Sequence, residues 1–340
     1  MKGWEITSKE VFSLIEREAA VLPDDQVKVK ITKSALTSTD GALYSGLGDK
    51  YPIIPGRAAT GIVSESTSDK FERGQRVVIS PYVNTAAQNG HAHSEQQKEL
   101  LFSDIDILGV NRDGFLRDFV VLPVENVVHM PDGINDDEAV FVEHIALALK
   151  ALDVLNVQNN EYVAILGANS LCDIFAQLVM YYHGVPIIID TNNELLSVCR
   201  SNGIYYTINP TETDCINRVL EITGGRMAEH VVFESRARLP FYSALSLARK
   251  KGTVALMGFN VFSDKIELNM TPLLKKQLTF TGINNGYNEI ASAINILANK
   301  ILKLDGLVSH KISFEEAPDT IKGMLLNPLN YRSIIVNNNI

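Results

Sequence analysis

The stretch that decides the fold runs from residue 162 to residue 190 and reads YVAILGANSLCDIFAQLVMYYHGVPIIID. A short apolar run (162–166) leads into a turn at Gly167, a helix-like segment follows, and a second apolar run ends at Asp190. Short apolar runs bounded by turn residues are typical of strands buried on both faces of a parallel sheet. A strand, a glycine turn, a helix and a second strand that ends in an acid form the frame of a dinucleotide-binding fold. We therefore expect a pyrophosphate to bind at the N-terminus of this helix.

The glycine pattern of this turn is incomplete. Gly167 is the tight-turn glycine, but Asn169 stands where a second glycine would let the backbone approach a phosphate. Cys172 stands where a third glycine would allow the helix to pack closely on the strand. Asparagine tolerates positive φ and cysteine is small, so the turn can survive. Two interpretations stay open: a working dinucleotide loop, or a doubly wound domain that has lost its nucleotide.

Asp190 bears on the choice of cofactor. A carboxylate at the end of the second strand accepts hydrogen bonds from free ribose hydroxyls and repels a 2′-phosphate, which favours NAD over NADP. The alternative is that Asp190 is only the N-cap of the helix that begins in TNNELL (191–196).

The secondary structure expected from the sequence differs between the first ~125 residues and the part of the chain after residue 134. From about residue 134, apolar strands alternate with helical segments, which predicts a parallel sheet with right-handed crossovers and helices on both faces. Strands are expected there at 162–166, 185–190, 230–235 and 252–259. The first ~125 residues instead contain short β-rich runs at 27–32, 61–65, 76–80 and 119–123, typical of a small barrel or sandwich. The polar segment 83–113 is expected to form a surface excursion.

Composition excludes several classes of protein. The chain has 340 residues, of which 46% are hydrophobic and 21% charged, as in a globular protein of about two domains. A net charge of −9 without a basic run argues against a nucleic-acid partner. No apolar run reaches the ~18 residues that cross a bilayer, and the N-terminus does not read as a secretory signal, so we expect no membrane partner. The three cysteines fit a reducing cytoplasm, and we expect a cytoplasmic protein.

Several motifs in this order resemble the medium-chain dehydrogenase/reductase family, and the zinc-type polyol and alcohol dehydrogenases within it. They are SALTSTDGALYSG (34–46), PIIPGRAATGIV (52–63), FERGQRVVI (71–79), DGFLRDFVVLP (113–123), AVFVEHIALALKAL (139–152), the strand–turn–helix above, HVVFES (230–235), KGTVALMG (251–258) and LVSHKISFEEAP (307–318). The resemblance implies an α/β fold with a GroES-like catalytic domain (1–133), a Rossmann domain (134–290), a C-terminal return segment (291–340) and an active site in the cleft between the domains. It also implies a homodimer or homotetramer, with GTVALMGF (252–259) and QLTFTGI (277–283) as edges for pairing.

The departures from the family motifs fall on the catalytic zinc ligands. The cysteine position of the first motif is Thr37, and the Gly-His-Glu of the second motif is Gly-Arg-Ala, with Arg57 at the histidine. The third position keeps an acid, Glu143. Zinc requires thiolate, imidazole or carboxylate donors, and a guanidinium repels a cation, so we expect no zinc. His91 and His93 form a His-x-His pair in the polar excursion, which we interpret as solvated rather than metal-binding.

The resemblance then implies which side chains remain for chemistry. Arg57, a permanent cation with forked donors, is the candidate to stabilise charge on the substrate oxygen in place of zinc. Glu143 is expected beside it, and the alternative is that this ion pair only fills the vacated cavity. Thr39 aligns with the hydroxyl that relays the substrate proton, or else serves as a turn or helix cap. Tyr44 falls at an aromatic position of the substrate cleft, with ordinary core packing as the alternative.

Cofactor contacts are carried over in the same way. The matching positions are Gly167, Asn169, Ser170, Leu171, Asp190, Ser235, Gly258, Phe259 and Arg332. Gly258 and Phe259 correspond to positions near the nicotinamide, and Arg332 to a pyrophosphate-binding arginine, whose fork suits a diphosphate.

Three hypotheses about function follow. The first is a zinc-independent, NAD(P)-dependent oxidoreductase that transfers a hydride between nicotinamide and a small carbonyl, alcohol or activated alkene. The second is a non-catalytic descendant that binds a nucleotide or small anion, or serves in an assembly, and the incomplete glycine pattern supports it. The third is a metal-dependent enzyme whose ligands have moved.

Overall fold

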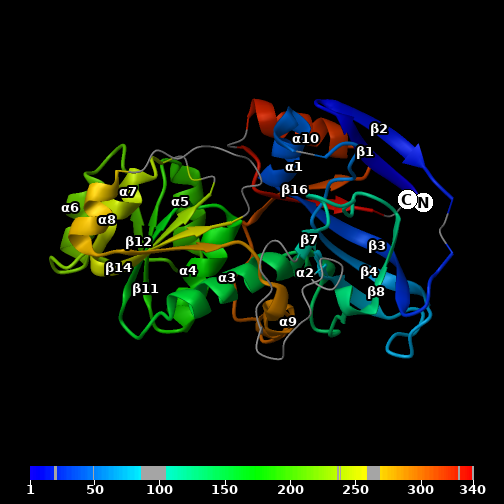
Figure 1. Cartoon of the computed structure of the whole chain (residues 1–340), viewed down its shortest axis with the longest axis horizontal. Helices are drawn as coiled ribbons and strands as arrows, with labels where there is room; N and C mark the ends of the chain where they lie inside the picture. The colour runs from blue at the N-terminus through cyan, green and yellow to red at the C-terminus, as the bar shows by residue number, and fades with distance from the viewer. Residues whose placement is uncertain are drawn as a thin grey trace. The chain divides into compact units, whose positions relative to one another are not determined.

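The computed structural model describes residues 1–18, 21–48, 50–85, 105–235, 237, 239–258, 269–327 and 330–338. The chain divides into two compact units. The first comprises Met1–Glu143, Ile290–Asn299 and Val308–Ile340, and the second comprises His144–Glu289 and Lys300–Leu307. The N-terminal segments, drawn in blue, and the C-terminal segments, drawn in red, therefore belong to the same unit (Figure 1).

The first unit is built on a sheet of seven strands. Their order is β16-β17-β3-β4-β5-β9, and β8 pairs with β3. The strands are β3 (Gln26–Leu36), β4 (Ala58–Ser66), β5 (Arg76–Ile79), β8 (Phe119–Pro123), β9 (Val127–His129), β16 (Val308–Ser313) and β17 (Ser333–Asn337). Alternate residues of β3 are buried, which is the period that a half-buried strand requires. The strands expected in the first 125 residues are thereby confirmed.

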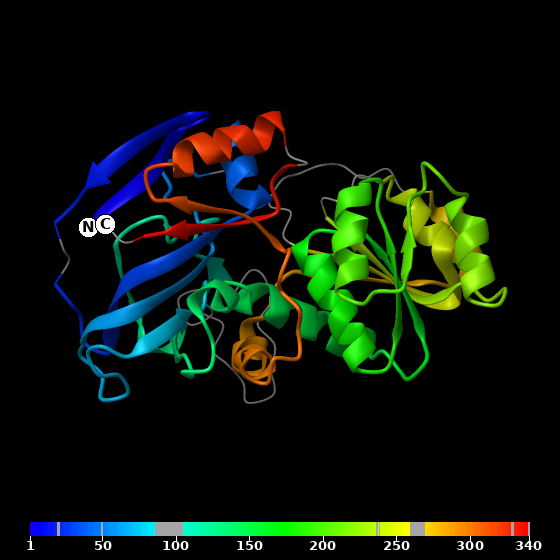
Figure 2. The ribbon, with the colours of Figure 1, turned by 180° about the vertical axis from the view of Figure 1, so that it is seen from behind.

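Two small sheets and several short helices complete this unit. The small sheets pair β1 (Lys2–Ser8) with β2 (Val11–Glu16), and β6 (Tyr82–Asn84) with β7 (Ile105–Ile107). The helices are α1 (Ser38–Ala42), η1 (Leu43–Leu47), η3 (Val124–Asn126), α2 (Asp136–Ala139), α9 (Ile290–Ala298) and α10 (Ala317–Leu326). The C-terminal helix α10 packs beside α1 (Figure 2), where a Cβ on Gly41 would lie 3.6 Å from Leu325 Cδ2. The return segment thus packs against the part of the chain that carries Thr39.

The second unit contains a six-stranded parallel sheet in the order β12-β11-β10-β13-β14-β15. The strands are β10 (Tyr162–Leu166), β11 (Val185–Ile189), β12 (Tyr206–Ile208), β13 (Ala228–Glu234), β14 (Ala248–Met257) and β15 (Thr279–Ile283). The helices are α3 (Val142–Leu155), which leads the chain into this unit, α4 (Ser170–Tyr181), α5 (Asn193–Ser201), α6 (Cys215–Ile222), α7 (Tyr242–Leu247), α8 (Met270–Lys276) and the 3₁₀ turn η4 (Tyr287–Glu289). The chain builds outward from β10 to β12 and then returns to β13, so the strand order reverses between β10 and β13. Ligands of doubly wound sheets bind outside the carboxyl ends of the strands at such a switch point.

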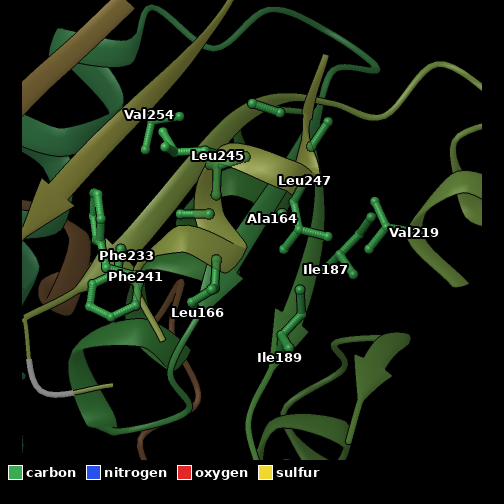
Figure 3. Close-up of a cluster of buried hydrophobic side chains, with 14 of the residues drawn as sticks. Ala164, Leu166, Ile187, Ile189, Val219, Phe233, Phe241, Leu245, Leu247 and Val254 are labelled. Atoms are coloured by element: carbon green, nitrogen blue, oxygen red, sulfur yellow. The ribbon is translucent and has the colours of Figure 1, made fainter. Parts of the chain in front are cut away.

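One face of this sheet packs against α6 and α7. Ala164 and Leu166 of β10 lie in one buried cluster with Leu245 of α7 and Val219 of α6 (Figure 3). Burial of one such aliphatic side chain contributes about 1.5–3 kcal/mol, so this cluster fixes the sheet that carries the glycine turn. The β–α alternation expected from residue 134 onward is confirmed, and the molecule has the α/β fold with two parts that the sequence predicted.

One expectation about the sheet edge is wrong. The segment GTVALMGF was expected to supply an edge for pairing, but its strand β14 lies inside the sheet, between β13 and β15. The strand of QLTFTGI, β15, forms an edge of this sheet within the described residues, and Phe280 on it is 46% exposed. In the part of the chain that the structure describes, no helix combines the length and the apolar character needed to span a bilayer.

Candidate functional site

The glycine turn follows β10, as the sequence predicted. Gly167 has a φ of +118°, which residues with a side chain rarely adopt, and its N–H donates to Ile189 O at 2.9 Å. A Cβ on Gly167 would lie 3.1 Å from Cys172 Sγ and 3.3 Å from Glu234 Cβ. The backbone conformation therefore favours glycine, and a side chain here would also be tight against Cys172 and Glu234, as expected of a loop that presents its backbone to a phosphate.

Asn169 supports this turn in a different way from the one expected. Its φ is −71°, so the turn forms without the positive φ that asparagine tolerates. It is instead the N-cap of α4, and its side-chain oxygen accepts from the N–H of Cys172 at 3.0 Å. The cap holds the turn but occupies one of the N–H groups that a bound phosphate would otherwise use. Ser170 and Leu171 form the first turn of the helix and are buried, and Ser170 Oγ donates to Leu307 O at 3.3 Å.

Asp190 ties two loops together at the carboxyl end of β11. One of its oxygens accepts from the N–H of Ala168 at 2.9 Å and the other from the N–H of Asn192 at 2.8 Å. The N-cap of α5 is Asn192, whose side chain accepts from the N–H groups of Glu194 and Leu195. The alternative that Asp190 is only the cap of this helix is therefore wrong. A carboxylate offers about four lone-pair sites, so these two bonds do not prevent it from accepting from ribose hydroxyls.

A second acid, which the sequence analysis did not select, lies beside the glycine turn. Glu234 ends β13 and is 5% exposed, and a Cβ on Gly258 would lie 3.1 Å from its Oε1.

Burial raises the pKa of the Cys172 thiol well above its usual value, and the charges of Glu234 and Asp190 raise it further. Cys172 is therefore a neutral packing residue rather than a nucleophile.

Ser235 and Gly258 lie at the carboxyl ends of β13 and β14. The N–H of Ser235 donates to Met257 O at 2.9 Å, and its Oγ donates to Glu234 Oε1 at 3.4 Å. Gly258 has a φ of +106°, and its N–H donates to Ile283 O at 3.0 Å. Both residues thus belong to the same end of the sheet as Gly167.

The last two expected cofactor residues lie elsewhere. Phe259 lies outside the described residues. Arg332 precedes β17 in the first unit, and its backbone N–H donates to Ser309 Oγ at 3.0 Å. Its Nε is buried and has no hydrogen-bond partner within the described part of the chain. The roles proposed for all these residues in binding a cofactor stay predictions.

A buried ion pair joins Arg57 and Glu143 in the first unit. Arg57 precedes β4, and Glu143 lies in the first turn of α3. Arg57 Nη2 donates to Glu143 Oε2 at 2.9 Å, while Tyr82 Oη donates to Glu143 Oε1 at 2.7 Å. The three residues are 8%, 3% and 2% exposed, in the order Arg57, Glu143, Tyr82. The ion pair expected from the sequence is confirmed, and Tyr82 is a third member that the sequence did not reveal.

The backbone before Arg57 is held by a glycine and a buried acid. Gly56 has a φ of +90°, and its N–H donates to Asp40 Oδ1 at 2.7 Å. The other oxygen of Asp40 accepts from the N–H of Thr37 at 2.7 Å, which completes the capping box of α1. A Cβ on Gly114 would approach Gly56 O to 2.2 Å, so that two backbone segments meet here without side chains between them. These contacts make the loop before Arg57 and the start of α1 one rigid support.

The charge of Arg57 is maintained despite its burial. Burial lowers the pKa of Arg57, but the neighbouring Glu143, Tyr82 and Asp40 raise it, and the net result is a pKa above the ordinary value. The guanidinium is thus a fixed cation whose charge is balanced by the carboxylate that it contacts.

Thr39 and Tyr44, the other two expected site residues, are both buried in the first unit. Thr39 is 2% exposed in α1, and the cap of this helix is Thr37, whose Oγ1 accepts from the N–H of Thr39 at 3.3 Å. The alternative that Thr39 is the cap is therefore wrong. Tyr44 Oη donates to Glu10 O at 2.7 Å, and its ring stacks on Phe12 at a centroid distance of 4.9 Å. These contacts favour the packing alternative for Tyr44.

Comparison with known proteins identifies the family. One family model, described as the alcohol dehydrogenase GroES-like domain, matches residues 23–132, and another, described as zinc-binding dehydrogenase, matches residues 177–299. The chain belongs to the medium-chain zinc-type alcohol dehydrogenase family.

Relatives of this family resemble the chain over nearly its whole length. An uncharacterized zinc-type alcohol dehydrogenase-like protein of Haemophilus influenzae is 28% identical over 316 residues, covering 92% of this chain and 91% of the relative. The crystal structure of the rspB dehydrogenase from Escherichia coli, complexed with NADH, has a TM-score of 0.86 at 23% identity and covers 99% of both chains. A zinc-binding dehydrogenase structure from Sinorhizobium meliloti, bound to NADP, has a TM-score of 0.85 at 20% identity, covering 99% of this chain and 98% of that one. At these identities the two structures establish the shared fold of the medium-chain family.

The family name raises the question of whether a zinc ion fits this member. At the positions where the resemblance implies zinc ligands, Thr37 caps a helix and the Arg57 guanidinium binds the Glu143 carboxylate. A guanidinium has no lone pair for a metal and repels a divalent cation, so these residues as arranged do not fit zinc. No group of three or more histidine, cysteine, aspartate or glutamate side chains suited to a metal occurs within the described residues. The pair His91 and His93 lies outside the described part of the chain.

Sequence analysis missed two functional residues, and only one of them carries a sequence signal. Glu234, like Asp190, is an acid at the carboxyl end of a buried strand, and it could have been selected on that ground. Tyr82 carries no comparable signal, since its role depends on a contact with Glu143, 61 residues away in the chain.

Proposed function

We propose that this protein is a zinc-independent, NAD-dependent oxidoreductase that acts on a small alcohol, polyol or carbonyl compound, with activated alkenes as a further substrate class. When bound, NAD supplies or accepts the hydride. The observation that carries the proposal is the buried Arg57–Glu143 ion pair, which lies where the resemblance implies a zinc ligand. It supports a fixed organic cation, rather than a metal, as the source of positive charge in the site.

The chain's own residues have separate roles in this proposal. Arg57 donates hydrogen bonds toward the substrate oxygen as negative charge develops on it. Thr39 moves the proton at that oxygen, since a hydroxyl can accept one hydrogen bond and donate another. Glu143 keeps the guanidinium in place. Tyr44 is the proposed aromatic residue of the substrate cleft, with its hydroxyl bonded to Glu10 O.

The same reasoning supports NAD over NADP as the cofactor. Asp190 is a buried carboxylate held on the glycine turn, and such a group accepts from ribose hydroxyls and repels a 2′-phosphate. The related structure with NADH supports a nicotinamide cofactor, while the one with NADP shows that this fold accommodates either form. Arg332, whose Nε has no partner within the described residues, is the proposed pyrophosphate contact.

A second candidate function is a non-catalytic protein that binds a nucleotide or small anion. Two observations favour it. The Asn169 side chain accepts from the Cys172 N–H at the N-terminus of α4, a donor that a phosphate would otherwise use, and the charge of Arg57 is already balanced by Glu143. In an assembly role, the β15 edge would pair with a second copy, which is also the contact that we propose for a homodimer of the enzyme.

A thermal-shift screen with NAD, NADH, NADP and NADPH separates these candidates. A ligand at 100 times its Kd stabilises the folded protein by about 2.7 kcal/mol, so NAD or NADH should raise the Tm and NADPH should raise it less. Turnover of an alcohol, polyol and carbonyl panel that survives extraction of the protein with a chelator supports the zinc-independent enzyme. Cofactor binding without turnover supports the second candidate, and activity that is lost with a chelator and restored by zinc overturns the proposal.

A further inference from the structure

Tyr82 is placed to act on the ion pair rather than on a substrate. Its phenol donates to Glu143 Oε1 at 2.7 Å, while Arg57 binds the other oxygen of the same carboxylate at 2.9 Å. All three side chains are at least nine-tenths buried. The carboxylate is therefore held from both oxygens by two donors of different charge.

The backbone around Tyr82 fixes the direction of its phenol. Tyr82 begins β6, where it is paired with Ile107 of β7. The side-chain amide of Asn126, which is 1% exposed, donates to Tyr82 O at 2.8 Å and to Ser80 O at 3.0 Å. These bonds clamp the strand on both sides of Pro81, so that the phenol is presented to Glu143 by a rigid frame.

A second donor on the carboxylate changes what the ion pair can do. A phenol on the second oxygen fixes the plane of the carboxylate without adding a charge. Charge-assisted hydrogen bonds of this kind are strong and directional, so the orientation of the guanidinium follows from that of the carboxylate.

We propose that Tyr82 is a positioning residue, which acts through Glu143 to hold the Arg57 guanidinium in its working orientation. This inference rests on the proposed function, since it assigns Arg57 a role at the substrate oxygen. Catalysis by hydrogen-bond donors depends on their being oriented before the reaction, and a small misplacement reduces kcat more than it weakens binding.

The test is a set of substitutions in the full chain, measured with NADH and the best carbonyl substrate of the panel. Tyr82→Phe removes only the hydroxyl and should lower kcat about tenfold, while the Kd for NADH and the substrate KM change less than about twofold. The control is Tyr51→Phe, which removes another phenol of the first unit whose hydroxyl donates to Leu43 O. It should leave kcat within about twofold of the wild type.

A double-mutant cycle shows whether Tyr82 acts through the ion pair. In the Glu143→Ala background, Tyr82→Phe should have little further effect on kcat, because the acceptor of the phenol is gone. If Glu143→Ala does not fold, Arg57→Lys replaces it in the cycle, because it keeps the charge but loses the forked geometry. Additive effects on kcat, or a Tyr82→Phe variant that behaves like Tyr51→Phe, would overturn the inference alone. Absence of wild-type turnover with every substrate would overturn the proposed function and this inference with it.

Discussion

The Glu143→Ala substitution tests most directly whether the site is built on a buried charge. It removes the partner of Arg57 Nη2, at 2.9 Å, and the acceptor of the Tyr82 phenol, at 2.7 Å. Two unit charges 2.9 Å apart attract each other by about 6 kcal/mol in a medium with an effective dielectric constant of about 20. Entry of water and the nearby Asp40 charge offset part of this loss. We expect Glu143→Ala to lower the free energy of unfolding by about 3–5 kcal/mol, the usual cost of leaving one buried charge unpaired.

The matched control removes the charges together. The triple variant Arg57→Met, Glu143→Leu, Tyr82→Phe replaces the two charged side chains and the phenol that bind one another with apolar side chains. Since buried ion pairs can be exchanged for apolar packing at little cost, its free energy of unfolding should stay within about 2 kcal/mol of the wild type. The difference between the two variants thus isolates the unpaired charge from the loss of packing.

The assay is urea unfolding followed by tryptophan fluorescence. Trp4 is the only tryptophan and lies in the first unit, where its Nε1 donates to Phe314 O at 3.0 Å. Its fluorescence therefore reports on the unit that contains the ion pair, and linear extrapolation gives the free energy of unfolding. A loss below about 1 kcal/mol for Glu143→Ala, or an equal loss for both variants, would refute the reasoning, because Arg57 would then not be a buried charge that depends on Glu143.

Three further predictions concern the second unit. Burial raises the pKa of Asp173, whose Oδ1 accepts from Gln177 Nε2 at 2.6 Å, so the folded state binds a proton more tightly than the unfolded state does. The stabilisation from this group is present below the unfolded pKa of about 3.9 and is lost as pH rises through the folded pKa. Asp173→Asn should therefore raise the Tm, relative to the wild type, more at pH 8 than at pH 4. A Tm below that of the wild type at pH 8 would contradict this. Lys276 Nζ donates to three carbonyls at the end of α7, at 2.9, 2.9 and 2.8 Å. Lys276→Met should therefore lower the free energy of unfolding by about 1–2 kcal/mol. The control is Lys275→Met, which changes an exposed side chain and should leave the free energy of unfolding unchanged. Gly167→Ala should lower stability by about 1–3 kcal/mol and weaken NADH binding in the thermal-shift assay, because a φ of +118° is strained for alanine, and unchanged NADH binding would count against the glycine turn as the cofactor site.

The parts of the fold that could be predicted from the sequence are those encoded by local patterns. The apolar runs of β10 and β11 and the alternation of β3 appear in the structure as expected, because burial on one or two faces imposes its period on the residues themselves. Edges are not encoded in this way. The runs that form β14 and β15 are both rich in β-forming residues, and only the strand order shows that β14 lies inside the sheet.

The two departures from the family motifs show where prediction of the site stops. Asn169, where the motif has a glycine, makes a local contact: its side chain accepts from the N–H three residues further on and caps the helix. Asparagine before a helix is a known signal for such a cap. Arg57, where the resemblance implies a zinc ligand, contacts Glu143, which lies 86 positions along the chain, and Glu143 in turn contacts Tyr82, 61 positions away from it. Its partner Glu143 could be expected only because the family motifs place it nearby, and Tyr82 follows from neither composition nor period. A cation in a site of this kind depends on three segments that meet only in the folded chain. For this reason the coupling between Tyr82 and Glu143 in kcat, measured by the double-mutant cycle, decides whether the Arg57 cation serves catalysis or is only a structural ion pair.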